Sequence, residues 1–515
     1  MVLLGAALVV FSLGDRGGTR RARVLGGNVP INAGARDERV IEAHNSPSMA
    51  RNPVAPENLA LANRVDTPAF SCALHVSNDA GVTWEKTEIP VPEGEEPPPR
   101  CFAPDVAFGS DGTMYVSFVM LKGSGNVPNS VWIVTSTDRG RTLSVPTKVS
   151  GPFAFQVRLL ADRSEPGRLY LSWLQSDGTA GYGFPTDGNP IVFTASDDGG
   201  TTWRPPSPAN HSSRRKVLAP SAALGPRGQL YLLFVDVKGD SLDYHAAHEG
   251  EGGEPYPGSW SLVLARSDDD GASWHETVVE EELVPTERFV VFEAPTPSVA
   301  VDPRNGWIYA GFHDGRLGDP DVWIWTSRNE GASFGAAARA NDNPTGDGTS
   351  QHLPALAVST DGRLDLLYYD RRADPQNRMT GVTVQSSSDG ATFTPGVSLS
   401  DRAFDSTIGF GSERSMPDLG SRLALLSTER RALAVWTDTR GGADVANKQD
   451  LARAVVAFDR PSSTRSWARA AGLLMLGAGA LAISAAAVVR ARRSSPLPDR
   501  KPENPEEFSG SRLNV

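Results

Sequence analysis

The stretch Ser77-Asn-Asp-Ala-Gly-Val-Thr-Trp84 decides the fold, because the chain returns to it. Close copies stand at 136–143, 196–203 and 267–274, and looser ones at 327–334 and 386–393. The copies begin 59, 60, 71, 60 and 59 residues apart. A nearly constant period of this length is typical of a β-propeller or a solenoid.

Each octet is predicted to be the turn between two strands, since β-forming residues such as Val131-Trp-Ile-Val-Thr135 precede it. An acid at the third position can accept hydrogen bonds from turn N–H groups, and the glycine supplies a positive φ. The Thr or Ser can bond the acid, and the aromatic residue can pack between sheets. The third positions are Asp79, Asp138, Asp198, Asp269, Asn329 and Ser388.

A second motif alternates with the octets. Pro104-Asp-Val-Ala107, for example, precedes Asp111-Gly-Thr-Met-Tyr-Val-Ser-Phe118, and seven such pairs can be found. Each unit therefore has four predicted strands, named A to D, with the octet as the C→D turn. The chain from 28 to 458 holds about seven units of roughly 60 residues. We predict an all-β, seven-bladed propeller, with six blades as the alternative.

The last unit ends with its third strand, at 450–458. Asn28-Val-Pro-Ile-Asn32 is predicted to supply the fourth strand and close the ring, which would leave no open sheet edge.

The octets resemble the Asp-box, or BNR repeat, of the sialidase-like superfamily. The resemblance implies an active site on the face that carries the D→A and B→C connections. It also implies an arginine triad, an Asp acid and a Tyr nucleophile assisted by Glu. The candidates for the Tyr are Tyr368 and Tyr369, and those for the Glu are Glu293 and Glu413. Where the family has Arg-Ile-Pro, this chain reads His44-Asn-Ser-Pro47.

Three predicted B→C loops begin alike, with Asp314-Gly-Arg316, Asp370-Arg-Arg372 and Asp438-Thr-Arg440. Guanidinium groups bind carboxylates in pairs of hydrogen bonds, so these arginines, with Arg100 and Arg414, are candidate ligand-binding residues. The alternative is that each Asp and Arg pair with one another as a structural staple, and the repetition of the motif favours it. The D→A connections also contain Arg158 and His352.

The composition excludes some partners. The net charge is −11, and there is no basic stripe outside 465–493, so we expect no nucleic-acid partner. The acidic insertion at 236–259, which includes His245 and His248, matches no metal-binding pattern. We expect a solvated loop there, and neither a metal nor a cofactor.

Cys72 and Cys101 are the only cysteines and fall in neighbouring units. We predict a disulfide between them, which would indicate an oxidising compartment. The alternative is two buried thiols.

The termini differ from the repeats. Residues 1–27 read as a leader, 28–459 as the propeller and 460–466 as a linker. Residues 470–489 carry no charge and precede Arg490-Ala-Arg-Arg493, so 467–489 is predicted to be a transmembrane helix. Residues 490–515 would then be a disordered cytoplasmic tail, with the propeller outside the cytoplasm.

The sequence therefore favours a membrane-anchored, extracytoplasmic propeller that binds a glycan or a protein on its D→A/B→C face. One alternative is an exo-glycosidase, similar to exo-α-sialidases, that cleaves terminal acidic sugars. A second is a structural or assembly-factor propeller.

Overall fold

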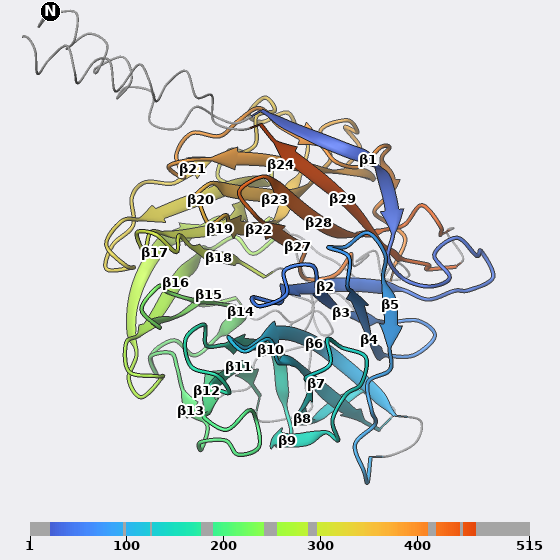
Figure 1. Ribbon diagram of the computed structural model, residues 1–515. Coiled ribbons are helices and arrows are strands. Elements are labelled where there is room, and N and C mark those ends of the chain that lie inside the picture. Colours follow the sequence, from blue (N-terminus) through green and yellow to red (C-terminus); the bar gives the residue numbers. More distant parts are fainter. Residues whose placement is uncertain are drawn as a thin grey trace, which may run out of the picture. The chain divides into compact units, whose positions relative to one another are not determined.

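Seven antiparallel sheets form a ring in the computed structural model (Figure 1). The structure describes residues 21–459, apart from 96–98, 124–125, 177–188, 241–254, 287–295, 410–418 and 443–445. Over these residues the chain is all-β, and the predicted seven blades are confirmed. The alternative of six blades is wrong.

Blades 1 to 6 each use consecutive strands, from the inner strand A to the outer strand D. The strands, blade by blade, are β2 (His44–Arg51), β3 (Leu59–Val65), β4 (Ser71–Ser77) and β5 (Glu85–Thr87); β6 (Arg100–Phe108), β7 (Met114–Lys122), β8 (Val127–Ser136) and β9 (Thr147–Ser150); β10 (Ala154–Ala161), β11 (Leu169–Gln175), β12 (Ile191–Ser196) and β13 (Ser207–Pro208); β14 (Val217–Leu224), β15 (Leu230–Asp236), β16 (Trp260–Ser267) and β17 (His275–Leu283); β18 (Ser298–Val301), β19 (Ile308–Asp314), β20 (Asp321–Ser327) and β21 (Ala338–Arg339); β22 (Gln351–Val358), β23 (Leu364–Asp370), β24 (Met379–Ser387) and β25 (Val397–Ser398). In blade 6, β26 (Phe404–Asp405) also pairs with β24.

Blade 7 joins the two ends of the propeller. It contains β27 (Ala424–Ser427), β28 (Arg431–Asp438), β29 (Asp450–Phe458) and, as its outer strand, β1 (Ala22–Pro30). The predicted closure of the ring is confirmed, and Asn32 extends it because its Oδ1 accepts a hydrogen bond from Leu451 N at 2.7 Å. β1 also includes residues 22–27, which the sequence analysis assigned to the leader.

The remaining leader residues at 1–20 and the predicted transmembrane segment at 467–489 lie outside the described residues. Within the part of the chain that the structure describes, no helix has the length and apolar character that crossing a membrane requires.

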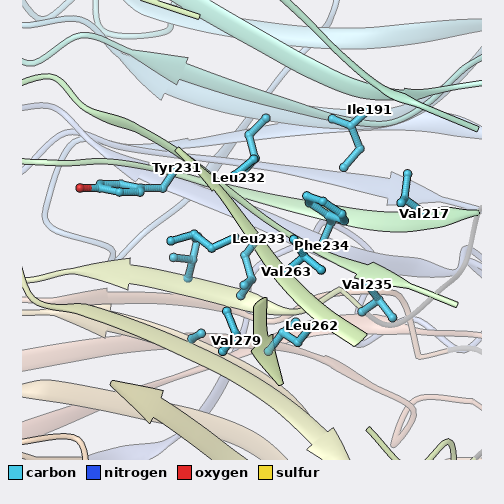
Figure 2. Close-up of a cluster of buried hydrophobic side chains, with 14 of the residues drawn as sticks. Ile191, Val217, Tyr231, Leu232, Leu233, Phe234, Val235, Leu262, Val263 and Val279 are labelled. Atoms are coloured by element: carbon cyan, nitrogen blue, oxygen red, sulfur yellow. The ribbon is translucent and has the colours of Figure 1, made fainter. Parts of the chain in front are cut away.

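The core lies between neighbouring blades. Every residue of β15 is buried, and successive side chains leave opposite faces of the strand (Figure 2). Leu232 and Phe234 belong to the same buried cluster as Ile191 of blade 3 and Val263 of blade 4. A strand covered on both faces needs a continuous apolar run, which explains why the second strands read as Leu-Tyr-Leu-Leu-Phe rather than as alternating patterns.

The octets form the C→D turns, as predicted. In the first, Asp79 Oδ1 accepts hydrogen bonds from Thr83 N at 2.8 Å and Ser77 Oγ at 2.8 Å, and Thr83 Oγ1 donates to Asp79 Oδ2 at 2.6 Å. Gly81 has a φ of 85°, and its N–H donates to Ser77 Oγ. Asp138, Asp198, Asp269 and Asn329 make the equivalent contacts in blades 2 to 5.

Blade 6 corrects one assignment. Asp389, and not Ser388, accepts the turn N–H groups of Ala391 and Thr392, each at 2.9 Å. The turn is one residue shorter here, since Gly390 N donates to Ser387 Oγ three residues earlier instead of four. A fixed octet template therefore placed the acid one position too early.

Blade 5 provides a natural control for the role of the acid, because Asn329 replaces Asp there and keeps the bonds to Ser327 and Ser333. We expect Asp269→Ala to lower the free energy of unfolding by about 1–2 kcal/mol and Asp269→Asn to cost less, because Asn keeps the acceptor. Urea denaturation of both variants measures this difference. Equal losses would contradict the assigned role.

Comparison of the wild type with Asp269→Asn also predicts how the stability depends on pH. Hydrogen bonds from the side chain and backbone of Ser273 lower the pKa of Asp269 from 3.8 to about 2. A carboxyl group whose pKa is lower in the folded state than in the unfolded state stabilises the fold when the pH is above its unfolded pKa. This stabilisation is lost as the pH falls through the pKa of the folded state. Between pH of about 4 and about 2, the wild type should therefore lose more stability than Asp269→Asn, as measured by urea denaturation at each pH.

Candidate functional site

The inner strands share a bulge near their first residues. The register shifts in the inner strands of blades 1, 2, 3, 4 and 6. In four of these strands a non-glycine residue at the bulge has a positive φ that such residues rarely adopt: 52° at Ser46, 49° at Ala103, 52° at Gln156 and 54° at Leu353. The same strained turn at the same place in several blades indicates a feature that the centre of the ring requires.

One residue per blade, at or near the start of the inner strand, lines the centre of the ring. We call these residues the axial residues: Ser48, Asp105, Arg158, Ser221, Ser298, Ala355 and Arg422. All seven line a cavity of about 250 Å3 at the centre of the ring. The bulges lie at the start of the inner strands, so the cavity lies toward the D→A/B→C face, on which the sequence analysis placed the site.

Three axial residues join their blade to the next one. Asp105 Oδ2 accepts a hydrogen bond from Leu159 N at 3.0 Å. Ser221 Oγ accepts from Val299 N at 3.3 Å, and Ser298 Oγ from Leu356 N at 2.9 Å. In each case the residue whose N–H donates is the one directly after the axial residue in the sequence of the next blade. The side chains thus satisfy N–H groups on the inner edge of the sheets, where no further strand can pair.

Arginines occupy two axial positions, and an arginine cannot accept such a bond. Arg158 donates to Val157 O at 3.1 Å and, across the cavity, to Thr296 Oγ1 at 3.0 Å. Arg422 donates to the backbone carbonyls of Ser46, at 3.0 Å, and Pro104. The Arg422 Nη1 atom lies 3.7 Å from Asp105 Oδ1, and the Arg422 side chain is only 13% exposed.

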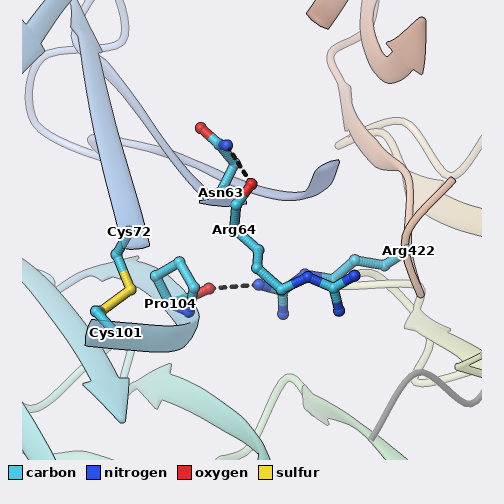
Figure 3. The surroundings of a disulfide bond; sticks show 6 residues. All are labelled: Asn63, Arg64, Cys72, Cys101, Pro104 and Arg422. Carbon is cyan, nitrogen blue, oxygen red and sulfur yellow. Dashed lines mark hydrogen bonds between the residues drawn. A yellow bond between two sulfur atoms is a disulfide. The ribbon is translucent and has the colours of Figure 1, made fainter. Parts of the chain in front are cut away.

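A third arginine approaches from the end of β3. Arg64 is 2% exposed and binds both oxygens of Asp66, at 2.6 and 2.8 Å. Its guanidinium lies 5.2 Å from the centre of the Phe102 ring, and it shares a small secondary pocket with Arg158 and Arg422. Figure 3 shows Arg64 and Arg422 beside Pro104.

The three arginines raise the positive charge around the cavity. Burial, together with the nearby charge of Arg422, lowers the pKa of Arg158 to about 9, so it is still protonated at neutral pH. Burial also lowers the pKa of Arg422, although Asp105 opposes this shift. Among the described residues of the two pockets and their ion pairs, Asp66 and Asp105 are the carboxylates. Over these described residues one positive charge is left over, and a surplus of positive charge attracts an anion.

The three arginines predicted from the D-x-R loops do not line this cavity. Each binds two carboxylates, one in its own loop motif and one from the preceding blade. The pairs are Arg316 with Asp314 (2.8 Å) and Glu280 (2.9 Å), Arg372 with Asp370 (2.7 Å) and Asp342 (2.6 Å), and Arg440 with Asp438 and Asp401. These contacts support the alternative that the loops are structural staples between blades.

The other predicted residues are also away from the cavity or outside the described residues. Tyr368 is buried between blades 5 and 6, where its hydroxyl donates to Gln385 Oε1 at 2.9 Å, and burial raises its pKa. Arg100 donates to Asn126 Oδ1 at 2.7 Å and to Gly123 O, both in the β7–β8 hairpin. Glu293, Glu413, Arg414, and His245 with His248 lie outside the described residues.

The predicted disulfide is confirmed. Cys72 of β4 and Cys101 of β6 join blades 1 and 2, with their Cα atoms 5.4 Å apart (Figure 3). Cys72 is the cross-strand partner of Arg64, and Cys101 precedes Phe102, over which Arg64 lies. The disulfide therefore holds together the two strands that position Arg64.

Sequence analysis named Arg158 but missed Arg64 and Arg422. The signal for Arg422 was present, because Gly420 has the positive φ of the bulge and Arg422 follows two residues later, as Ser48 follows Ser46. Arg64 had no such signal, since it comes from a second strand and reaches the centre only through its side chain.

Comparisons with known proteins give similar folds. A protein of unknown function from Dyadobacter fermentans aligns at 17% identity and a TM-score of 0.46, covering 85% of this chain and 99% of the other. An α-L-arabinofuranosidase of Fusarium graminearum aligns at 16% identity and a TM-score of 0.43, covering 67% and 92%. The phage phi92 endosialidase aligns at 9% identity and a TM-score of 0.47, covering 85% and 70%. Similarity at this level says nothing about the activity of this chain. No protein-family model and no curated protein matches it.

The staple arginines yield a stability prediction. We expect Arg440→Ala to lower the free energy of unfolding by about 1–3 kcal/mol, because it leaves Asp438 buried without its cation. Arg402→Ala, which removes an exposed arginine from the same region, should change it by less than about 0.5 kcal/mol. Chemical denaturation compares the two. If Arg440→Ala were as stable as Arg402→Ala, the staple would have no structural role.

Proposed function

We propose that this protein is a binding propeller that takes an anionic group of a glycan ligand into its axial cavity. The observation that supports this most directly is the position of Arg158 and Arg422. Both lie deep in the ring, both line the cavity, and they share Asp105 as their nearby carboxylate. Burying like charges side by side is costly, so a fold that keeps two such arginines gains from an anion between them.

The Asp-box resemblance supports a glycan as the source of this anion, since acidic sugars are ligands of that superfamily. The size of the cavity agrees with a single small group. A volume of about 250 Å3 is below the usual range for a drug-sized ligand and suits one charged substituent or one sugar unit.

We propose binding rather than hydrolysis. A glycosidase of the sialidase type needs a Tyr nucleophile in contact with substrate. Tyr368 lies in the interface between blades 5 and 6, bonded to Gln385 and Arg372. The carboxylate on the described cavity lining, Asp105, already accepts bonds from Ser48 Oγ, Leu159 N and Val106 N.

Binding is tested with the purified full-length protein on an array of acidic and neutral glycans. We expect retention of acidic glycans, weaker at high salt, because added ions screen the arginine charge. Arg158→Gln should weaken retention by about tenfold or more, because it removes charge-assisted hydrogen bonds, whereas the staple variant Arg372→Gln should not.

A fluorogenic sialoside is the matching test for catalysis, and we expect no turnover. If the wild type hydrolyses the sialoside and Arg158→Gln abolishes this turnover, the site is that of a glycosidase and the proposal of binding without hydrolysis is wrong. Equal retention of acidic and neutral glycans by well-folded protein would contradict the proposed function.

We also propose that the propeller lies in an oxidising compartment outside the cytoplasm, anchored by the apolar segment at 467–489. The Cys72–Cys101 disulfide supports the compartment, because disulfides rarely persist in the cytosol. Alkylation of thiols in intact cells, followed by peptide mass spectrometry, should find both cysteines unmodified and linked. Reduced, alkylated cysteines would contradict this localisation.

A further inference from the structure

The cavity wall opposite Asp105 consists of hydroxyl groups with defined orientation. Ser221 Oγ and Ser298 Oγ accept the N–H groups of Val299 and Leu356, and Thr296 Oγ1 accepts a hydrogen bond from Arg158. A hydroxyl that accepts a fixed donor has its own hydrogen left to give. Among the described residues, none accepts the hydroxyl hydrogens of Ser221, Thr296 or Ser298, and all three residues line the cavity.

Arg158 and Arg422 supply further donors, although some of their N–H groups already bind other atoms of the protein. Arg422 uses Nε for Ser46 O and Nη2 for Pro104 O, so one of the two edges with which a guanidinium grips a carboxylate is occupied. Arg158 uses Nη1 for Val157 O and Nη2 for Thr296 Oγ1. The Nη1 atom of Arg422 also lies 3.7 Å from Asp105 Oδ1, so both guanidinium groups meet the cavity with part of their N–H groups already used.

The donors come from different directions. Arg158 belongs to blade 3, Ser221 to blade 4, Thr296 and Ser298 to the start of blade 5, and Arg422 to blade 7. The carboxylate on the described lining, Asp105, already accepts bonds from Ser48 Oγ, Leu159 N and Val106 N. The cavity thus presents several single donors distributed around its wall.

We propose that the group held in this cavity is a tetrahedral oxyanion, such as a sulfate or phosphate ester on a sugar, rather than a carboxylate. A carboxylate has two oxygens in one plane and is best held by one paired N–H edge. An ester of sulfate or phosphate has three free oxygens that point in different directions, and phosphate oxygens are strong acceptors. Distributed single donors fit the second geometry. This inference rests on the proposed function and names the ligand class of the same site.

A matched ligand series tests the inference. Isothermal titration of the full-length protein compares glucose, glucuronic acid, glucose 6-sulfate and glucose 6-phosphate, which differ only at the sixth carbon. We expect at least one ester to bind about tenfold tighter than glucuronic acid, since each added hydrogen bond to a charged group has about this effect. The ranking of the two esters identifies the source of the oxyanion.

Variants of the hydroxyl wall provide the second readout. Thr296→Val should weaken ester binding by about tenfold and leave glucuronic acid within about twofold, whereas Thr296→Ser, which keeps the hydroxyl, should bind like the wild type. Ser298→Ala should act in the same direction. Since it also removes the bond from Leu356 N, its melting temperature is compared with that of Ser298→Thr, which keeps the acceptor.

The outcomes separate this inference from the proposed function. If glucuronic acid binds as tightly as both esters, and Arg158→Gln weakens it, the carboxylate is the bound group; the inference then fails while the proposed function stands. If no member of the series binds and Arg158→Gln changes nothing, both fail. Ester binding that Thr296→Val leaves intact would also overturn the inference.

Discussion

The inner strand of every blade has one edge that no further strand can pair, and this constraint organises the centre of the molecule. Buried N–H groups need acceptors. Asp105, Ser221 and Ser298 provide them for the next blade, at 2.9–3.3 Å. An axial side chain that accepts a bond thus joins two blades. Where the axial residue is an arginine, it cannot do so, and its charge faces the cavity instead. The axial position of a blade therefore either joins two blades or contributes a charge to the cavity.

Two other sets of contacts keep this centre in place. The C→D turns are held by the side chain at the third octet position, as in blades 1 and 2, where Asp79 and Asp138 each accept two turn N–H groups. The D-x-R loops connect adjacent blades through arginines that each bind two carboxylates. The disulfide adds a covalent link between blades 1 and 2, beside Arg64. Binding groups on a scaffold held in this way are preorganised, which lowers the cost of ordering them around a ligand.

The arginines of this protein fall into two classes that their carboxylate partners distinguish. Arg316 and Arg372 each have two carboxylates, so a ligand would have to displace an existing ion pair. Arg158 and Arg422 instead donate to backbone carbonyls and a hydroxyl, and among the described lining residues they share one nearby carboxylate, Asp105. A count of arginines on one face could not separate the classes. Their partners do, because a guanidinium held by neutral acceptors still attracts an anion.

The repeat by itself predicted the β-propeller, the seven blades and the closing strand, because each follows from local patterns at a fixed period. The disulfide was predicted from the two cysteines in neighbouring units. Only the tertiary structure decided the site. Arg64, Arg158 and Arg422 are far apart in sequence and line one pocket because the ring brings strands of blades 1, 3 and 7 to a common centre. The candidates from the sequence were instead residues that share a visible motif, Arg316, Arg372 and Arg440. The repetition of that motif already favoured a structural role, and their ion pairs agree with it. A sequence pattern that recurs in every blade identifies residues that every blade requires for its structure. A site that arises once at the axis, from positions that differ between blades, does not repeat, so periodicity alone could not locate it.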